Sequence, residues 1–185
     1  MFDRFTDNSK LALNRARIAA DEFGHAYLGA EHMLYGLLSA RENGAGRILA
    51  ALRVKVEDLR RYLSSRMPPP EKSRSSFGQL PFNPQAKRSL ELAMQAAEDS
   101  RHGRIGTEHL LIGLSECGSD LVTEVLREHG LAAKVLRFEL MDCNGPPKNV
   151  EEREVTLEWA AAIARQLGDE DTARRIEALI QRLRP

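Results

Sequence analysis

Apolar residues recur every three to four positions through most of the chain, which is the spacing of amphipathic helices. Over the first 65 residues this pattern predicts four helices, at about 7–23, 30–40, 45–52 and 55–65. Thr6 precedes the first helix as an N-cap, and Gly24 follows it as a stop signal. Because apolar runs with a period of two are lacking, we expect an all-α fold.

The same pattern returns 77 residues later without a gap. It predicts helices at about 84–101, 119–129 and 132–141, and another that begins with Thr107 as its N-cap. Asn83 caps the first of these, and Pro84 takes its first helical position. Two such units indicate a tandem duplication packed with approximate two-fold symmetry. The residues of the first unit that recur identically in the second are Phe5, Lys10, Leu13, Ala16, Ala19, Ala20, His25, Gly29, Glu31, His32, Leu34, Gly36, Leu37, Leu49, Leu59, Arg60 and Leu63.

Two proline-rich stretches divide the chain, because a run of prolines breaks both helices and strands. We expect a body over 1–142, made of repeat one (1–65), a linker (66–81) and repeat two (82–142). A second linker (143–153) and a C-terminal helical hairpin (154–185) follow. A hairpin of this size buries little apolar surface alone. It is expected to dock on the body or to pair with a second copy as a homodimer.

Composition excludes several classes of function. The chain carries 27 basic and 27 acidic residues and only 5% aromatics, which argues against a nucleic-acid partner. It has no phosphate-binding loop motif, so we expect no nucleotide cofactor. Two cysteines without C-x-x-C spacing, no signal-peptide pattern and no long apolar run predict a cytoplasmic protein with no membrane segment.

The repeated motif reads Gly-Ala-Glu-His-Met-Leu-Tyr-Gly-Leu at residues 29–37 and Gly-Thr-Glu-His-Leu-Leu-Ile-Gly-Leu at 106–114. Together with the opening Phe2-Asp3-Arg4-Phe5-Thr6, this resembles the N-terminal domain of the Clp ATPases, particularly the ClpC type. The resemblance covers about residues 1–142 and excludes the hairpin. It implies two four-helix Clp repeats that form a non-catalytic module. Such a module binds adaptor proteins, substrate proteins or Clp ATPase subunits and so modulates Clp-dependent proteolysis.

In the ClpC type, the Glu of each motif helps to bind phosphorylated arginine. Carried over by position, the resemblance implies a ligand site at Glu31 with Ala30 in repeat one, and at Glu108 with Thr107 in repeat two. A Thr at that place would be the helix N-cap, so Ala30 predicts the loss of a cap worth about 1 kcal/mol. It also removes a hydroxyl that could contact a phosphate. The second repeat is therefore the better candidate.

From the residues alone, two interpretations of these glutamates stay open. A Glu in the first turn of a helix complements the positive end of the helix dipole. It can also accept a guanidinium in bidentate geometry, while backbone N–H groups there hold a phosphate. The four motif histidines, His25, His32, His102 and His109, are expected to bond to backbone carbonyls and to bind no metal, because no ligand spacing supports one. Alternative functions are an oligomerisation protein that pairs through the hairpin, or a hydrolase with a nucleophile and a base that converge in a pocket. Cys117 lies in a Glu-Cys-Gly-Ser turn without an evident base, which argues against it as that nucleophile.

Overall fold

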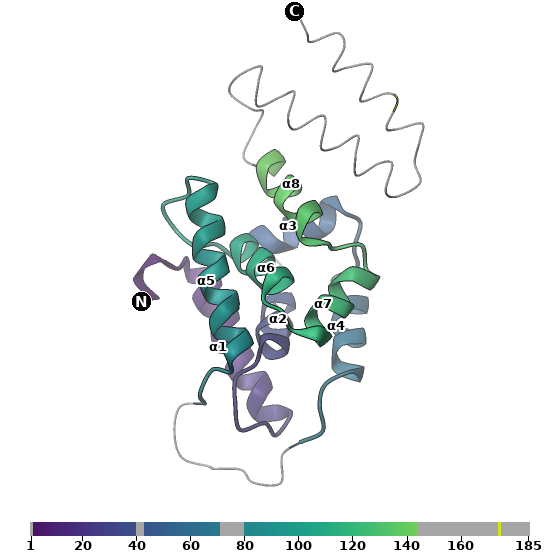
Figure 1. Cartoon of the computed structure of the whole chain (residues 1–185). Helices are drawn as coiled ribbons and strands as arrows, with labels where there is room; N and C mark the ends of the chain where they lie inside the picture. The colour runs from purple at the N-terminus through teal and green to yellow at the C-terminus, as the bar shows by residue number, and fades with distance from the viewer. Residues whose placement is uncertain (1, 40–42, 71–79, 144–173, 175–185) are drawn as a thin grey trace, which may run out of the picture. The chain divides into compact units, whose positions relative to one another are not determined.

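The computed structural model describes residues 2–39, 43–70, 80–143 and 174, and within them the fold is all-helical. A short 3-10 turn, η1, precedes eight α-helices (Figure 1). Their bounds are η1 Phe2–Arg4, α1 Asp7–Glu22, α2 Ala30–Leu38, α3 Gly44–Ala51, α4 Val56–Ser65, α5 Pro84–Asp99, α6 Thr107–Glu116, α7 Asp120–Glu128 and α8 Ala133–Cys143. The predicted all-α class and the helices of both repeats are confirmed.

Each repeat begins with a helical hairpin whose two helices pack at very short range. α1 packs along α2, and α5 packs along α6. A glycine in the second helix of each pair allows this approach: a Cβ at Gly36 would overlap the backbone of Ala12, and one at Gly113 would overlap the backbone of Ser89. The cost of glycine inside a helix is about 1 kcal/mol. Close packing of the two backbones explains why both repeats carry it.

The two repeats are joined by reciprocal contacts that display the predicted two-fold symmetry. Phe5 forms an isolated bridge with Ile105, and Leu28 forms one with Phe82. An offset of 77 residues converts one bridge into the other. The hydrogen bonds follow the same exchange. Ile105 N donates to Arg4 O at 2.8 Å and Leu28 N donates to Pro81 O at 2.8 Å, and both acceptors lie in the segment before the first helix of the other repeat.

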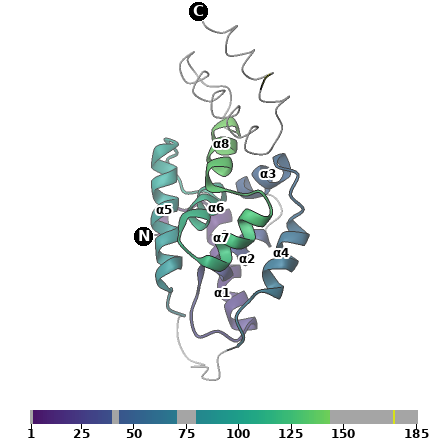
Figure 2. The same cartoon turned by 45° about the vertical axis from the view of Figure 1, so that its right-hand side comes forward.

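The core lies along α2 and α6, which pass between α5 on one side and α4 on the other (Figure 1 and Figure 2). These two helices contact each other, and each also packs on the third helix of the opposite repeat, α6 on α3 and α2 on α7. Leucines are the largest group among their buried side chains: Leu34, Leu37 and Leu38 from α2, and Leu110, Leu111 and Leu114 from α6. The repeats are thus interlocked and do not merely adjoin.

Two of the predicted N-caps are present as expected. Thr6 Oγ1 accepts from Ser9 N at 3.3 Å, and Asn83 Oδ1 accepts from Ala86 N at 2.8 Å. Gly24 ends α1 in the left-handed region, at φ 75°. In the described part of the chain, no helix combines the length and the hydropathy that a bilayer crossing requires.

The chain divides into two compact units, Met1–Leu136 and Arg137–Pro185, with the boundary inside α8. The first unit holds both copies of the motif. The predicted hairpin at 154–185 and the linker at 143–153 lie, except for Cys143 and residue 174, outside the described residues. The domain boundaries and the homodimer through the hairpin therefore stay predictions.

Candidate functional site

The second copy of the motif opens α6, and its N-cap is Gly106 rather than Thr107. Gly106 has extended backbone angles (φ −86°, ψ 174°), and Thr107 is the first helical residue. The prediction that Thr107 caps this helix is wrong. The histidine two positions later does the capping work instead: Gly106 N donates to His109 Nδ1 at 2.8 Å. Repeat one has the same arrangement, with Gly29 N donating to His32 Nδ1 at 3.0 Å. The predicted loss of a cap at Ala30 is therefore also wrong.

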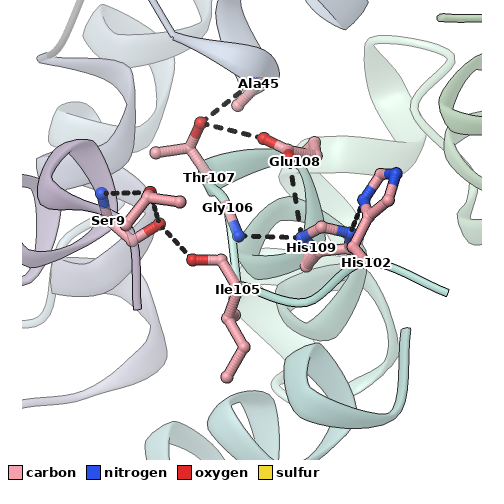
Figure 3. Close-up of polar contacts among 9 residues, drawn as sticks. Ser9, Ala45, His102, Ile105, Gly106, Thr107, Glu108 and His109 are labelled. Carbon is pink, nitrogen blue, oxygen red and sulfur yellow. Dashed lines mark hydrogen bonds and ion pairs between the residues drawn. The ribbon is translucent and has the colours of Figure 1, made fainter. Parts of the chain in front are cut away.

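Thr107 uses its hydroxyl to join α6 to α3. Thr107 Oγ1 accepts from Ala45 N, in the first turn of α3, at 3.1 Å, and it donates to Glu108 Oε2 at 3.4 Å (Figure 3). The side chain is 1% exposed. The N–H groups of a first helical turn have no acceptor inside their own helix. Thr107 thus supplies the acceptor that one of them needs and fixes the neighbouring carboxylate.

Glu108 lies where the N-termini of α6 and α3 meet. Its carboxylate is packed so closely on Gly44 that a Cβ at that glycine would overlap Oε2. Asn43 caps α3 through a bond from Gly46 N to its Oδ1 at 2.8 Å. Two positive helix ends therefore face one carboxylate. The side chain of Glu108 is 19% exposed, so part of the carboxylate is open to solvent.

The motif histidines form pairs. His109 Nε2 lies 2.8 Å from His102 Nδ1, and His32 Nε2 lies 2.6 Å from His25 Nδ1. A backbone N–H can only donate, so Nδ1 of His109 and of His32 accepts, and a neutral ring then carries its proton on Nε2. Each inner ring donates to its outer partner, which leaves the outer Nε2 as a donor. In repeat one this donor reaches Pro68 O at 3.0 Å.

Within the described residues, the prediction that the motif histidines bond to backbone carbonyls thus holds for His25 alone. His32 and His109 accept from backbone amides instead. One oxygen of Glu108 and one nitrogen each of His102 and His109 lie within 4.8 Å of one another, a grouping that could suit a metal ion. Both nitrogens of His109 are already used in hydrogen bonds, however. This favours a network of hydrogen bonds over a metal site at this place. That the site holds no metal remains our prediction.

Repeat one has the same motif in a more closed setting. Ala30 is fully buried, and the side chain of Glu31 is 7% exposed against 19% for Glu108. Burial raises the pKa of Glu31, and it lowers the pKa of His32 to about 4, with the nearby His25 adding to the effect. Burial also lowers the pKa of His109, although there Glu108 opposes the shift.

Ala30 is tolerated because α7, the helix that α2 contacts, supplies from its own N-cap the acceptor for its first-turn N–H group. Val122, which corresponds to Ala45 at the 77-residue offset, donates its N–H to Ser119 Oγ at 3.5 Å. Ser119 is the N-cap of α7. The equivalent amide, Ala45 N of α3 in repeat one, depends on Thr107 of repeat two instead. The difference between Ala30 and Thr107 in the two motifs is thus matched by a change in the helix that each motif contacts.

All four residues of the predicted sites lie in the first turns of α2 and α6, as the sequence indicated. The structure places Glu108 with Thr107 and keeps Glu31 with Ala30 in a separate, more buried position. Sequence reasoning missed the contribution of α3, through Gly44 and Ala45. Its signal was the Asn-Gly pair that starts this helix, since Asn is a strong N-cap and the glycine leaves room for a neighbouring group.

Comparison with known proteins identifies the same region. The Clp repeat (R) N-terminal domain family matches residues 4–129. The negative regulator of genetic competence ClpC/MecB of Bacillus subtilis is 30% identical over 145 residues, covering 78% of this chain and 18% of that protein. Chloroplastic ClpC1 of Arabidopsis thaliana is 31% identical over 153 residues, covering 81% and 16%. The chain thus spans less than a fifth of the length of these relatives.

Solved structures agree on the fold. The N-terminal domain of ClpD from Arabidopsis thaliana superposes with a TM-score of 0.60 at 22% identity, covering 78% of this chain and 97% of that one. A ClpV N-domain, solved in complex with a VipB peptide, gives a TM-score of 0.57 at 18% identity and covers 72% and 82%. Together with the family match over most of the described residues, this shows that the chain belongs to the Clp repeat N-terminal domain family.

Proposed function

We propose that this chain is a non-catalytic protein-binding module that recognises proteins carrying phosphorylated arginine. The observation that supports this is the partly exposed carboxylate of Glu108 at the junction of two helix N-termini. A carboxylate accepts the parallel N–H groups of a guanidinium, and positive helix ends attract the attached phosphoryl group. Both halves of the modified side chain find a complementary charge there.

In this proposal the four predicted site residues have different roles. Glu108 contacts the ligand. Thr107 is a positioning residue, because its hydroxyl is buried and directed at Glu108 and Ala45. Glu31 is nearly closed to solvent and Ala30 offers no hydroxyl, so repeat one contributes little to binding. The chain therefore has one strong site rather than two equal ones.

The partners that fit this role are adaptor proteins, marked substrate proteins and Clp ATPase subunits, through which the chain would modulate proteolysis. The ClpV N-domain shares the fold and was solved with a peptide, which supports a peptide-binding role. Catalysis at Cys117 is disfavoured, since the buried thiol donates to Leu114 O at 3.2 Å and burial raises its pKa. A cytoplasmic location remains part of the proposal.

Titration calorimetry with three versions of one peptide tests the proposal. The versions carry phosphoarginine, arginine or phosphoserine at the same position. We expect binding of the first only, weakened about tenfold or more in Glu108→Gln, because a hydrogen bond to a charged group contributes about 1.5–3 kcal/mol. Glu31→Gln is the matched control and should leave the affinity within about twofold. If Glu108→Gln lowers stability but the wild-type chain binds no version, the carboxylate only neutralises the helix ends and the proposal fails.

A further inference from the structure

In repeat one, an extended segment of the chain lies against the outer histidine. His25 Nε2, at the end of the hydrogen-bond series from Gly29 through His32, donates to Pro68 O at 3.0 Å. Two residues later, Pro70 lies over Gly24, where its Cβ is 2.9 Å from the position that a glycine Cβ would take. His25 is 1% exposed under this cover. The first repeat thus holds an extended peptide by one carbonyl and one neighbouring side chain.

Repeat two builds the same donor. Gly106, His109 and His102 repeat the series of bonds, so His102 also presents an Nε2–H at its outer edge. Arg101 adopts the left-handed backbone of its counterpart Gly24, with φ 55° against 75°. Among the described residues, His102 Nε2 has no hydrogen-bond partner, and a Cβ at Gly103 would meet open space. His102 is correspondingly more exposed than His25. Figure 3 shows the His102 ring on the far side of His109, with its second nitrogen directed away from it.

The surroundings of the two donors differ in chemistry. His25 stacks on Phe23 and Tyr27, with ring centroids 6.3 and 5.8 Å apart. The corresponding positions in repeat two are Ser100 and Arg104. Arg101 corresponds to Gly24, whose missing Cβ leaves room for Pro70 in repeat one. A proline ring at the equivalent place in repeat two would therefore clash with the Cβ of Arg101. Arg101 is exposed, and in the described part of the chain its guanidinium makes no ion pair.

From this comparison we infer that His102 and Arg101 form a second peptide-binding site, which takes an extended acidic segment of another protein. His102 Nε2–H donates to a backbone carbonyl of the segment, as His25 does to Pro68. Arg101 pairs with a carboxylate two residues further along, at the place that Pro70 takes in repeat one. Glu108 lies within 4.8 Å of the His102–His109 pair, so the acidic side chain of the ligand must lie on the Arg101 side. The inference requires a protein-binding module but not the recognition of phosphoarginine.

Fluorescence anisotropy with labelled peptides tests this on the full chain. The parent peptide copies residues 66–70, and two versions carry Pro70→Glu or Pro70→Lys. We expect the Glu version to bind at least about fivefold tighter than the Lys version, the factor that an exposed ion pair of about 1 kcal/mol carries. Arg101→Asn should abolish this preference. Asparagine tolerates the left-handed backbone, so the fold is retained.

A second set of variants tests the histidine. In His102→Asn the side-chain oxygen can still accept from His109, but the shorter amide places no donor where Nε2–H lies, so both peptides should bind at least about fivefold more weakly. His25→Asn, the counterpart in repeat one, should leave the preference for Glu over Lys unchanged. Glu108→Gln should leave that preference unchanged too, while weakening the phosphoarginine binding proposed above about tenfold or more. Equal binding of the two peptides, no binding of the Glu version, or a preference that survives Arg101→Asn would overturn the inference.

Discussion

The hydroxyl of Thr107 is the polar link between the two repeats that is easiest to remove without changing volume. Thr107→Val keeps the shape of the side chain but leaves Ala45 N–H without its acceptor at a buried position. An unsatisfied buried donor costs about 1–3 kcal/mol. We therefore expect the free energy of unfolding to fall by about 1–3 kcal/mol, with no loss of helix content in the folded state.

Urea unfolding of the full chain, followed by circular dichroism, measures this change. Two variants serve as matched controls. Thr123→Val makes the same substitution at an exposed position of α7 and should change stability by less than about 0.5 kcal/mol. Thr107→Ser retains the hydroxyl and loses one buried methyl group, a cost of about 1 kcal/mol. If Thr107→Val is as stable as the wild type within about 0.5 kcal/mol, Ala45 has another acceptor and the bridge does not stabilise the fold.

Two further predictions concern stability. Burial holds the pKa of His32 near 4, against an ordinary 6.5, so the unfolded chain binds more protons than the folded chain between these values. The free energy of unfolding should therefore decrease as the pH is lowered across this window, by up to about 1.4 kcal/mol per pH unit. The raised pKa of Glu31 opposes this change only near and above its ordinary 4.5. Between pH 7 and 5, the plot of unfolding free energy against pH should therefore have different slopes in wild type and in His32→Gln. Parallel slopes would contradict the assignment. Gly113→Ala should destabilise the fold by about 1–3 kcal/mol through overlap with the backbone of Ser89, although alanine favours helix. Gly103→Ala, in open space, should be neutral within about 0.5 kcal/mol. Urea midpoints compare the two variants, and a stabilised Gly113→Ala would refute the close packing of α5 on α6.

The local pattern was sufficient for the helices and for the symmetry. Thr6 and Asn83 cap their helices as predicted, because an N-cap bonds to an amide only three residues away. The 77-residue repeat anticipated the reciprocal bridges between Phe5 and Ile105 and between Leu28 and Phe82 only in general terms. A duplication indicates that two units exist, but it does not specify which segments they exchange.

The errors arose where contacts cross between the repeats. Thr107 was assigned to its own helix, although its hydroxyl serves an amide 62 residues away. No local spacing contains that information. The difference between Glu31 and Glu108 has the same origin: both glutamates lie between the same Gly and His positions of their motifs, but their exposure depends on α7 and α3, which come from the opposite repeat. The histidine pairs were missed because His32 and His25 are seven residues apart and meet only through the loop before α2.

The claim that most needs testing is that the chain has one phosphoarginine site and that Glu108 forms it. The stoichiometry of phosphoarginine-peptide binding, measured by calorimetry on the full chain, tests it most directly. The account predicts one peptide per chain, with the affinity lowered about tenfold or more in Glu108→Gln and retained in Glu31→Gln. Two equal sites per chain, or a single site that Glu31→Gln removes, would contradict it.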